Sequence, residues 1–151
     1  MGKKYFYCCS LPLGPGSIVN PGNWGRIIKT YTPQTSPNAW LFIRELIFEE
    51  VRREFFPQKP SRFCSIFLCQ DLEGIQEFKK VSNRVLDIIY EVEVLEEQLQ
   101  AHTGDWTLFS IQNNDTYATF SDRAKLYWSG ENITKPEFVT VSSIKIIKKV
   151  E

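Results

Sequence analysis

The most informative stretch of this chain is Leu13-Gly-Pro-Gly-Ser-Ile-Val-Asn-Pro-Gly-Asn-Trp-Gly-Arg26, and its counterpart further along is Lys59-Pro-Ser-Arg62. The first stretch holds four glycines and two prolines and follows an apolar N-terminal run. Glycine lets backbone N–H groups approach a ligand closely, and the guanidinium of arginine binds phosphate through paired hydrogen bonds. Two such loops, each beside a predicted strand, indicate a site for a phosphorylated ligand, with a dinucleotide as the favoured kind.

The bulk composition indicates a single domain over residues 1–151, long enough to bury a core. Hydrophobic residues make up 42% of the chain and charged residues 24%, which is ordinary for a globular protein. The 18 basic residues balance the 18 acidic ones, so net charge gives no argument for a nucleic-acid or membrane partner, although a local basic patch stays open. No apolar run approaches a membrane span, and the basic N-terminus lacks the apolar length of a signal peptide. We therefore expect a cytoplasmic protein that makes no membrane contact.

The cysteines predict packing rather than metal binding. They are Cys8, Cys9, Cys64 and Cys69. Neighbouring strand residues point to opposite faces, so Cys8 and Cys9 are poorly placed to hold one ion, and the same holds for the other two if they share a strand. No Cys-x-x-Cys occurs. We expect reduced thiols packed as small apolar side chains, and no metal.

Residue patterns predict an α+β domain with a mixed or antiparallel sheet. The predicted strands are 5–9, 62–68, 85–95, 106–111 and 137–150, the last as one strand or a pair. The predicted helices are 38–55, 71–81 capped by Asp71, and a third that is capped by Asn114 or Asp115 and closed by Gly130. Residues 96–101 are expected to form one helical turn. The segments 11–25 and 31–38 are expected to be loops, the first one functional because of its length and composition.

The predicted helix 38–55 carries an apolar stripe at helical spacing. The stripe consists of Trp40, Ile43, Ile47, Val51 and Phe55, and it predicts the buried face. The charged residues of the same helix, such as Glu49 and Arg53, are expected to form a solvated face.

The familiar nucleotide and hydrolase signatures are absent from the sequence. Gly14-Pro-Gly16 lacks the third glycine of the dinucleotide fingerprint, and there is no Walker lysine. No Gly-x-Ser-x-Gly occurs either. The only histidine, His102, lies in the polar segment 100–105, which predicts an exposed loop residue rather than a catalytic base. A Cys–His pair stays open, without local support.

Several segments, taken in order, resemble small ADP-ribosyltransferases, the group that includes rifamycin-modifying ADP-ribosyltransferases and an uncharacterised bacterial family related to them. The Glu-headed strand near the C-terminus is also similar to toxins that ADP-ribosylate DNA. Pro-Gly-Asn-Trp-Gly-Arg and Pro-Ser-Arg are the distinctive pieces. The resembling segments are Tyr5–Ser10, Leu13–Ser17, Pro21–Arg26, Pro57–Arg62, Tyr90–Val94, Glu137–Val139 and Ser143–Ile147.

The resemblance implies a split, strongly bent antiparallel sheet with a few flanking helices, which binds NAD as a substrate in its cleft. It implies cleavage of the nicotinamide–ribose bond and transfer of ADP-ribose to an acceptor. Breaking that bond develops oxocarbenium charge on the ribose, as in glycoside hydrolysis, and a nearby carboxylate stabilises it. Glu137 is the expected carboxylate, with Asp105 as the second choice.

The resemblance also implies which residues hold NAD. Arg26 or Arg62 would pair with the pyrophosphate, Ser61 would brace the cleft, and Trp24 or Tyr5 would stack on the nicotinamide.

The end of the first strand would complete the NAD site. The backbone around Cys8 and Cys9 would hold the carboxamide, next to Ser10. The antibiotic-modifying relatives carry His near this point where the chain has Cys8, and a thiol does not replace imidazole as a fixed donor. Either the site differs from theirs or the correspondence is shifted by one residue.

Other interpretations stay open beside the enzyme. The glycines can serve turns alone, the arginines can form surface ion pairs, and Glu137 can be a solvated residue at the start of a strand. The chain would then be an inactive nucleotide-binding or protein-interaction module on the same fold. A further alternative is an NAD glycohydrolase. As an active transferase it would act as a toxin or defence effector with a cognate inhibitor protein, on an acceptor that is a protein, a nucleic acid or a small molecule.

Overall fold

The structure is a computed structural model that describes residues 2–34 and 38–151. In this part of the chain, seven strands form one antiparallel sheet. The strands are β1 Lys4–Cys9, β2 Ile18–Val19, β3 Ile66–Cys69, β4 Ile88–Val94, β5 Ala101–Asp105, β6 Pro136–Thr140 and β7 Ile144–Lys149. The helices are α1 Asn23–Ile28, α2 Asn38–Phe55, α3 Leu72–Val81 and α4 Tyr117–Ser129, with the 3₁₀ helices η1 Arg62–Cys64 and η2 Trp106–Phe109. The predicted α+β class with an antiparallel sheet is confirmed.

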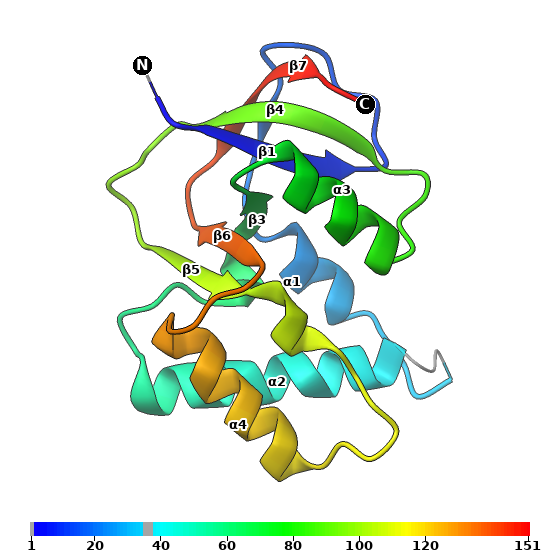
Figure 1. Cartoon of the computed structure of the whole chain (residues 1–151), viewed down its shortest axis with the longest axis vertical. Helices are drawn as coiled ribbons and strands as arrows, with labels where there is room; N and C mark the ends of the chain where they lie inside the picture. Colours follow the sequence, from blue (N-terminus) through cyan, green and yellow to red (C-terminus); the bar gives the residue numbers. More distant parts are fainter. Residues whose placement is uncertain (1, 35–37) are drawn as a thin grey trace.

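The sheet is strongly curled. Its strand order is β2-β7-β4-β1-β3-β6-β5. Strands β1 and β4 pair along their whole length, from Lys4 opposite Glu93 to Cys9 opposite Ile88. Strands β1 and β3, in contrast, share one pair, Phe6 with Cys69. At this narrow junction the sheet turns, so that β7, β4 and β1 run across the top of Figure 1 while β6 and β5 lie below.

The helices divide between the two parts of the sheet. Helix α3 packs on β1 and β3, and α4 packs on α2, β5 and η2. Helix α1 packs on η1 and touches α2. Figure 1 shows α3 in the upper part of the molecule and α2 with α4 in the lower part, with α1 between them. Among the described residues, no helix is both long enough and apolar enough to cross a membrane.

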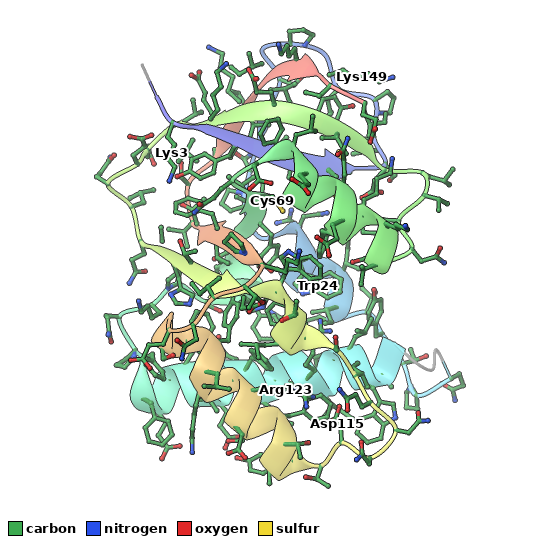
Figure 2. All side chains as sticks on the ribbon, in the orientation of Figure 1. Lys3, Trp24, Cys69, Asp115, Arg123 and Lys149 are labelled. Atoms are coloured by element: carbon green, nitrogen blue, oxygen red, sulfur yellow. The ribbon has the colours of Figure 1, made fainter. Side chains whose placement is uncertain are left out.

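The helix ends follow from local hydrogen bonds. The side chain of Asp71 accepts from the backbone N–H of Gly74 and caps α3, as predicted. Gly130 ends α4 in the left-handed conformation, with φ 71°, also as predicted. The N-cap of α4, however, is Thr116 and not Asn114 or Asp115. Asp115 instead accepts hydrogen bonds from Arg123, which lies beside it at the foot of the molecule in Figure 2.

Three predicted segments between residues 62 and 111 were wrong in kind. Residues 62–64 form a 3₁₀ helix, so β3 begins only at Ile66 and Cys64 is exposed. Residues 96–101 form no helical turn of their own. Residues 106–109 form a 3₁₀ helix instead of a strand, because the side chain of Asp105 accepts from the backbone N–H of Thr107 and turns the chain.

His102 is buried rather than exposed in a loop. It lies on β5, with 4% of its surface exposed, and its Nε2 is 2.7 Å from the carbonyl oxygen of Tyr127. Burial lowers the pKa of His102 to about 4, so the imidazole is neutral at physiological pH. This neutral ring packs against Tyr127 and Trp128.

Helix α2 has the predicted bounds, but only part of its predicted buried face is confirmed, since Ile47 and Val51 are buried and the other three residues of the stripe are exposed. Trp40 and Phe55 are about half exposed, with 48% and 51% of their surface accessible. The face turned inward carries charge: Arg44, Glu45 and Glu49 are all buried. Burial of these charges is tolerated because each finds an oppositely charged partner.

Candidate functional site

A cavity of about 1090 Å³ lies where the sheet turns. Its walls come from β1, β3, β6, α1, α2, α3, α4, η1 and η2. Two residues labelled in Figure 2, Trp24 of α1 and Cys69 at the end of β3, mark its position in the middle of the molecule. The cavity is therefore built by segments that are far apart in sequence and meet through the curl of the sheet.

Aromatic rings form much of the cavity wall. Trp24, Phe78, Trp106 and Phe109 all line it. The rings of Phe78 and Trp106 meet edge to face, with centroids 5.5 Å apart. Such rings offer flat apolar surface to a planar ligand.

A buried charge cluster lies at the cavity wall and contributes Arg44, Arg62 and Glu137 to it. At its centre, Arg62 donates from Nε to Glu45 Oε2 at 3.0 Å and from Nη2 to Glu45 Oε1 at 3.1 Å. Its third nitrogen, Nη1, donates to Glu137 Oε1 at 2.8 Å and to the Tyr127 hydroxyl at 2.9 Å. The guanidinium also lies 3.8 Å from the centroid of the Phe109 ring. Arg62 thus joins α2, α4 and β6 at one point.

Glu45 balances the positive charge of this cluster. Its Oε1 also accepts from Arg44 Nη2 at 3.2 Å and from Trp24 Nε1 at 3.0 Å. Burial alone would raise the pKa of Glu45, but the charges of Arg62 and Arg44 outweigh burial and lower this pKa to about 2. Glu45 is therefore ionised at physiological pH, and it fixes the orientation of Trp24 as well as of both arginines.

Glu137 differs from Glu45 although both touch Arg62. Burial raises the pKa of Glu137, and the charge of Arg62 offsets this only in part. Its Oε1 accepts from Arg62, whereas its Oε2 has no hydrogen-bond partner among the described residues. Glu137 lies on β6 opposite Cys69 of β3 and lines the cavity. A ligand in the cavity would find this oxygen free.

The structure brings four of the predicted site residues together. Glu137, Arg62, Trp24 and Cys8 all line the cavity. Ser61 lies next to them in sequence but outside the lining; its hydroxyl donates to Glu49 Oε2 and accepts from the backbone N–H of Phe63. Ser61 braces the turn that places Arg62.

Four other predicted residues lie outside the cavity wall. Tyr5 is buried among apolar residues of β3, β4 and β7, and its ring stacks on Phe138 with centroids 4.6 Å apart. Cys9 packs with the same core cluster, while Ser10 and Arg26 are exposed. None of the four is among the cavity-lining residues.

Asp105 is also outside the cavity. One of its oxygens accepts from the backbone and hydroxyl of Thr107, and the other accepts from the backbone and hydroxyl of Thr134. With both oxygens occupied, Asp105 ties the end of β5 to the start of β6.

The thiols in the cavity are protonated. Burial raises the pKa of Cys8 to about 12 and raises the pKa of Cys69 as well. A thiol, in contrast to a thiolate, is a weak nucleophile and metal ligand. The described residues contain no group of three or more metal-ligating side chains, and all four cysteines are free.

Three residues at the site were not predicted from the sequence, namely Arg44, Glu45 and Arg84. Arg44 and Glu45 belong to the helix whose charges were predicted to form a solvated face, and Arg84 was not among the predicted site residues, yet Arg44 and Arg84 line the cavity. No local signal marks the first two as buried, because Arg44 and Glu45 stand among the other charged residues of α2, and Glu49 of the same helix is buried as well. No signal in the sequence points to Arg84.

The family model described as "Protein of unknown function (DUF2441)" matches residues 16–151. The chain belongs to this family. The matched range includes the Gly-rich stretch from Gly16 onward, the charge cluster and all of the described helices, and it leaves out β1. No curated protein matches the chain.

Proposed function

We propose that the chain is an NAD-dependent ADP-ribosyltransferase whose NAD site is the cavity at the turn of the sheet. The observation that carries this proposal is Glu137, a buried carboxyl group that reaches the cavity with one oxygen held by Arg62 and the other free. The resemblance of the Pro-Gly-Asn-Trp-Gly-Arg and Pro-Ser-Arg segments supports it.

The size and lining of the cavity suit a dinucleotide. Its volume of about 1090 Å³ is at the upper end of the roughly 300–1,000 Å³ seen for small-molecule sites. The aromatic rings of Trp24 and Trp106 offer stacking surfaces for the two ring systems of NAD. Trp24 is held by its hydrogen bond to Glu45, so its ring is in place before a ligand binds.

Glu137 would act on the ribose next to the nicotinamide. As the C–N bond to nicotinamide breaks, its electron pair leaves with nicotinamide and positive charge develops on the ribose. The free oxygen of Glu137 would accept a hydrogen bond from a ribose hydroxyl and stabilise that charge. Arg62 would keep the carboxyl group in position through its 2.8 Å hydrogen bond. The acceptor then attacks the ribose carbon and gives up a proton.

The test uses NAD labelled in its adenylate part. The labelled NAD is incubated with the purified chain and, in turn, with the protein, RNA, DNA and small-molecule fractions of a bacterial lysate. The wild type is compared with Glu137→Gln, which keeps the shape of the side chain, and with Glu93→Gln on β4. Glu93 is a matched control because it is partly exposed and lies outside the cavity.

Label transfer by the wild type and Glu93→Gln, with a loss of roughly a hundredfold or more in Glu137→Gln, supports the proposal and identifies the acceptor class. Free ADP-ribose without transfer would instead make the chain an NAD glycohydrolase. If NAD is neither cleaved nor bound, the enzyme proposal fails and a binding module on this fold takes its place.

A further inference from the structure

We propose that Arg44 and Arg84 form a two-point site for phosphate groups inside the cavity, so that a pyrophosphate compound binds more tightly than a monophosphate. This inference rests on the proposed function only in taking the cavity as the ligand site. It assigns the anion contact to two residues other than Arg26 and Arg62, the pair that the sequence suggested.

Arg26 and Arg62 are not available for this role. Arg26 is exposed and does not line the cavity. Each nitrogen of Arg62 already donates to Glu45, Glu137 or Tyr127. A phosphate at Arg62 would have to displace a buried carboxylate, at the cost of leaving that charge unpaired.

Arg44 has more unused donors than Arg62, whose hydrogen bonds within the described residues leave only one N–H, on Nη2, without an acceptor. It lies on α2, is only 8% exposed and lines the cavity. Its Nη1 donates to the carbonyl oxygen of Phe109 at 2.9 Å and its Nη2 to Glu45 at 3.2 Å. Its Nε is buried without any partner, and the second N–H of each terminal nitrogen has none among the described residues. Buried unpaired donors of a cation are costly, and a ligand oxygen would relieve that cost.

Arg84 lies in the loop after α3 and lines the cavity. Two backbone hydrogen bonds hold its main chain: its N–H donates to the carbonyl oxygen of Lys79 at 2.9 Å, and its carbonyl oxygen accepts from the N–H of Asp87 at 3.0 Å. Its Nε lies 2.7 Å from Asp87 Oδ2 in an ion pair, and its side chain is 44% exposed. Within the described residues, its terminal nitrogens donate no hydrogen bond.

Beyond their partners Glu45 and Asp87, these two cations meet no further acidic side chain among the described residues of the cavity wall that is not already held by another arginine. The acidic residues of the wall are Asp115 and Glu137. Asp115 is held by Arg123, and Glu137 by Arg62. Arg44 comes from the lower part of the molecule and Arg84 from the upper part, which follows from the places of α2 and α3 in Figure 1. Because both arginines line the same cavity, the two-point site requires that two linked phosphates reach both of them and that a single phosphate reaches one.

The test is calorimetric titration of the purified chain with inorganic pyrophosphate and, separately, with inorganic phosphate. The variants are Arg44→Gln and Arg84→Gln, with Arg53→Gln as the control. Arg53 lies on the same helix as Arg44, but its side chain is 75% exposed and outside the cavity. Arg44→Lys is included because it keeps the charge beside Glu45 while removing the planar fork. Thermal unfolding of each variant checks that it is folded.

The wild type and Arg53→Gln should bind pyrophosphate more tightly than phosphate. Arg44→Gln and Arg84→Gln should each weaken pyrophosphate binding roughly tenfold or more, and Arg44→Lys should weaken it as well. Absence of pyrophosphate binding to the wild type, or dependence on only one arginine, would overturn the two-point site. Because this titration needs no turnover, pyrophosphate binding in a chain that leaves NAD intact would retain the anion site and reject the transferase.

Discussion

Arg62 and Glu45 form the central contact of this protein at the scale of single residues. The guanidinium of Arg62 uses two nitrogens for Glu45 and the third for Glu137 and Tyr127. Such a buried pair is not in itself a source of stability, since removing two charges from water is expensive. The pair instead orients Arg62, because the two hydrogen bonds to Glu45 hold the guanidinium so that its Nη1 donates to Glu137.

Glu45→Gln should lower the free energy of unfolding by about 3–5 kcal/mol at pH 7, because it leaves Arg62 and Arg44 buried without a counter-charge. The pKa of Glu45 is lowered to about 2 from the ordinary 4.5. The stabilisation from this carboxylate is therefore complete above about pH 4.5 and is lost as the pH falls towards 2. Denaturant unfolding at several pH values measures both effects, and the gap between the two proteins should narrow as the pH falls through this window.

Glu93→Gln is the control, since Glu93 is 40% exposed and 3.6 Å from Lys145. It should cost less than about 1 kcal/mol. An equal loss in both variants would contradict the role given to Glu45.

Among the secondary-structure elements, α1 and η1 make a close contact that fixes part of the cavity wall. Gly25 of α1 lies so close to η1 that an added Cβ would be 2.0 Å from the carbonyl oxygen of Phe63. That oxygen belongs to the backbone and cannot rotate away. The contact holds Trp24, the preceding residue, against Glu45.

Gly25→Ala should therefore destabilise the protein by roughly 3 kcal/mol or more, because α1 must move away from η1. Gly14→Ala is the comparison: nothing lies within 4 Å of its added Cβ, so it should change stability by less than about 1 kcal/mol. Thermal unfolding of the two variants decides the matter. Similar melting temperatures would mean that α1 is not held as closely as described.

Sequence patterns predicted only those features of the helices around the site that depend on local signals. The length of α2, the cap of α3 and the end of α4 depend on local signals, so they could be predicted. The burial of Arg44 and Glu45 could not, because Glu45 pairs with Arg62, 17 residues away, and Arg44 donates to the carbonyl oxygen of Phe109, 65 residues away. His102 was misjudged for a similar reason, since its partner Tyr127 is 25 residues away.

At the scale of the whole molecule, the curl of the sheet produces the cavity. The narrow β1–β3 junction lets the two parts of the sheet turn, and the space between them is lined by nine helices and strands. The α+β class follows from the order of strands and helices, whereas the curl depends on pairings between distant strands. Trp24 and Arg62 were predicted from distinctive segments, and Glu137 from the resemblance of the strand that it begins; all three line the cavity. Arg84 was not predicted, because only the fold brings its loop to the cavity.

The most direct measurement is fluorine NMR of the chain labelled with 5-fluorotryptophan, titrated with NAD and assigned by Trp→Phe variants. Trp24 and Trp106 line the cavity. Trp128 is fully buried elsewhere, with its Nε1 donating to the carbonyl oxygen of Phe48 at 2.9 Å, and is an internal control. If NAD binds in this cavity, it should shift the Trp24 and Trp106 signals and leave the Trp128 signal in place. Unchanged signals from Trp24 and Trp106 at saturating NAD would contradict an NAD site there.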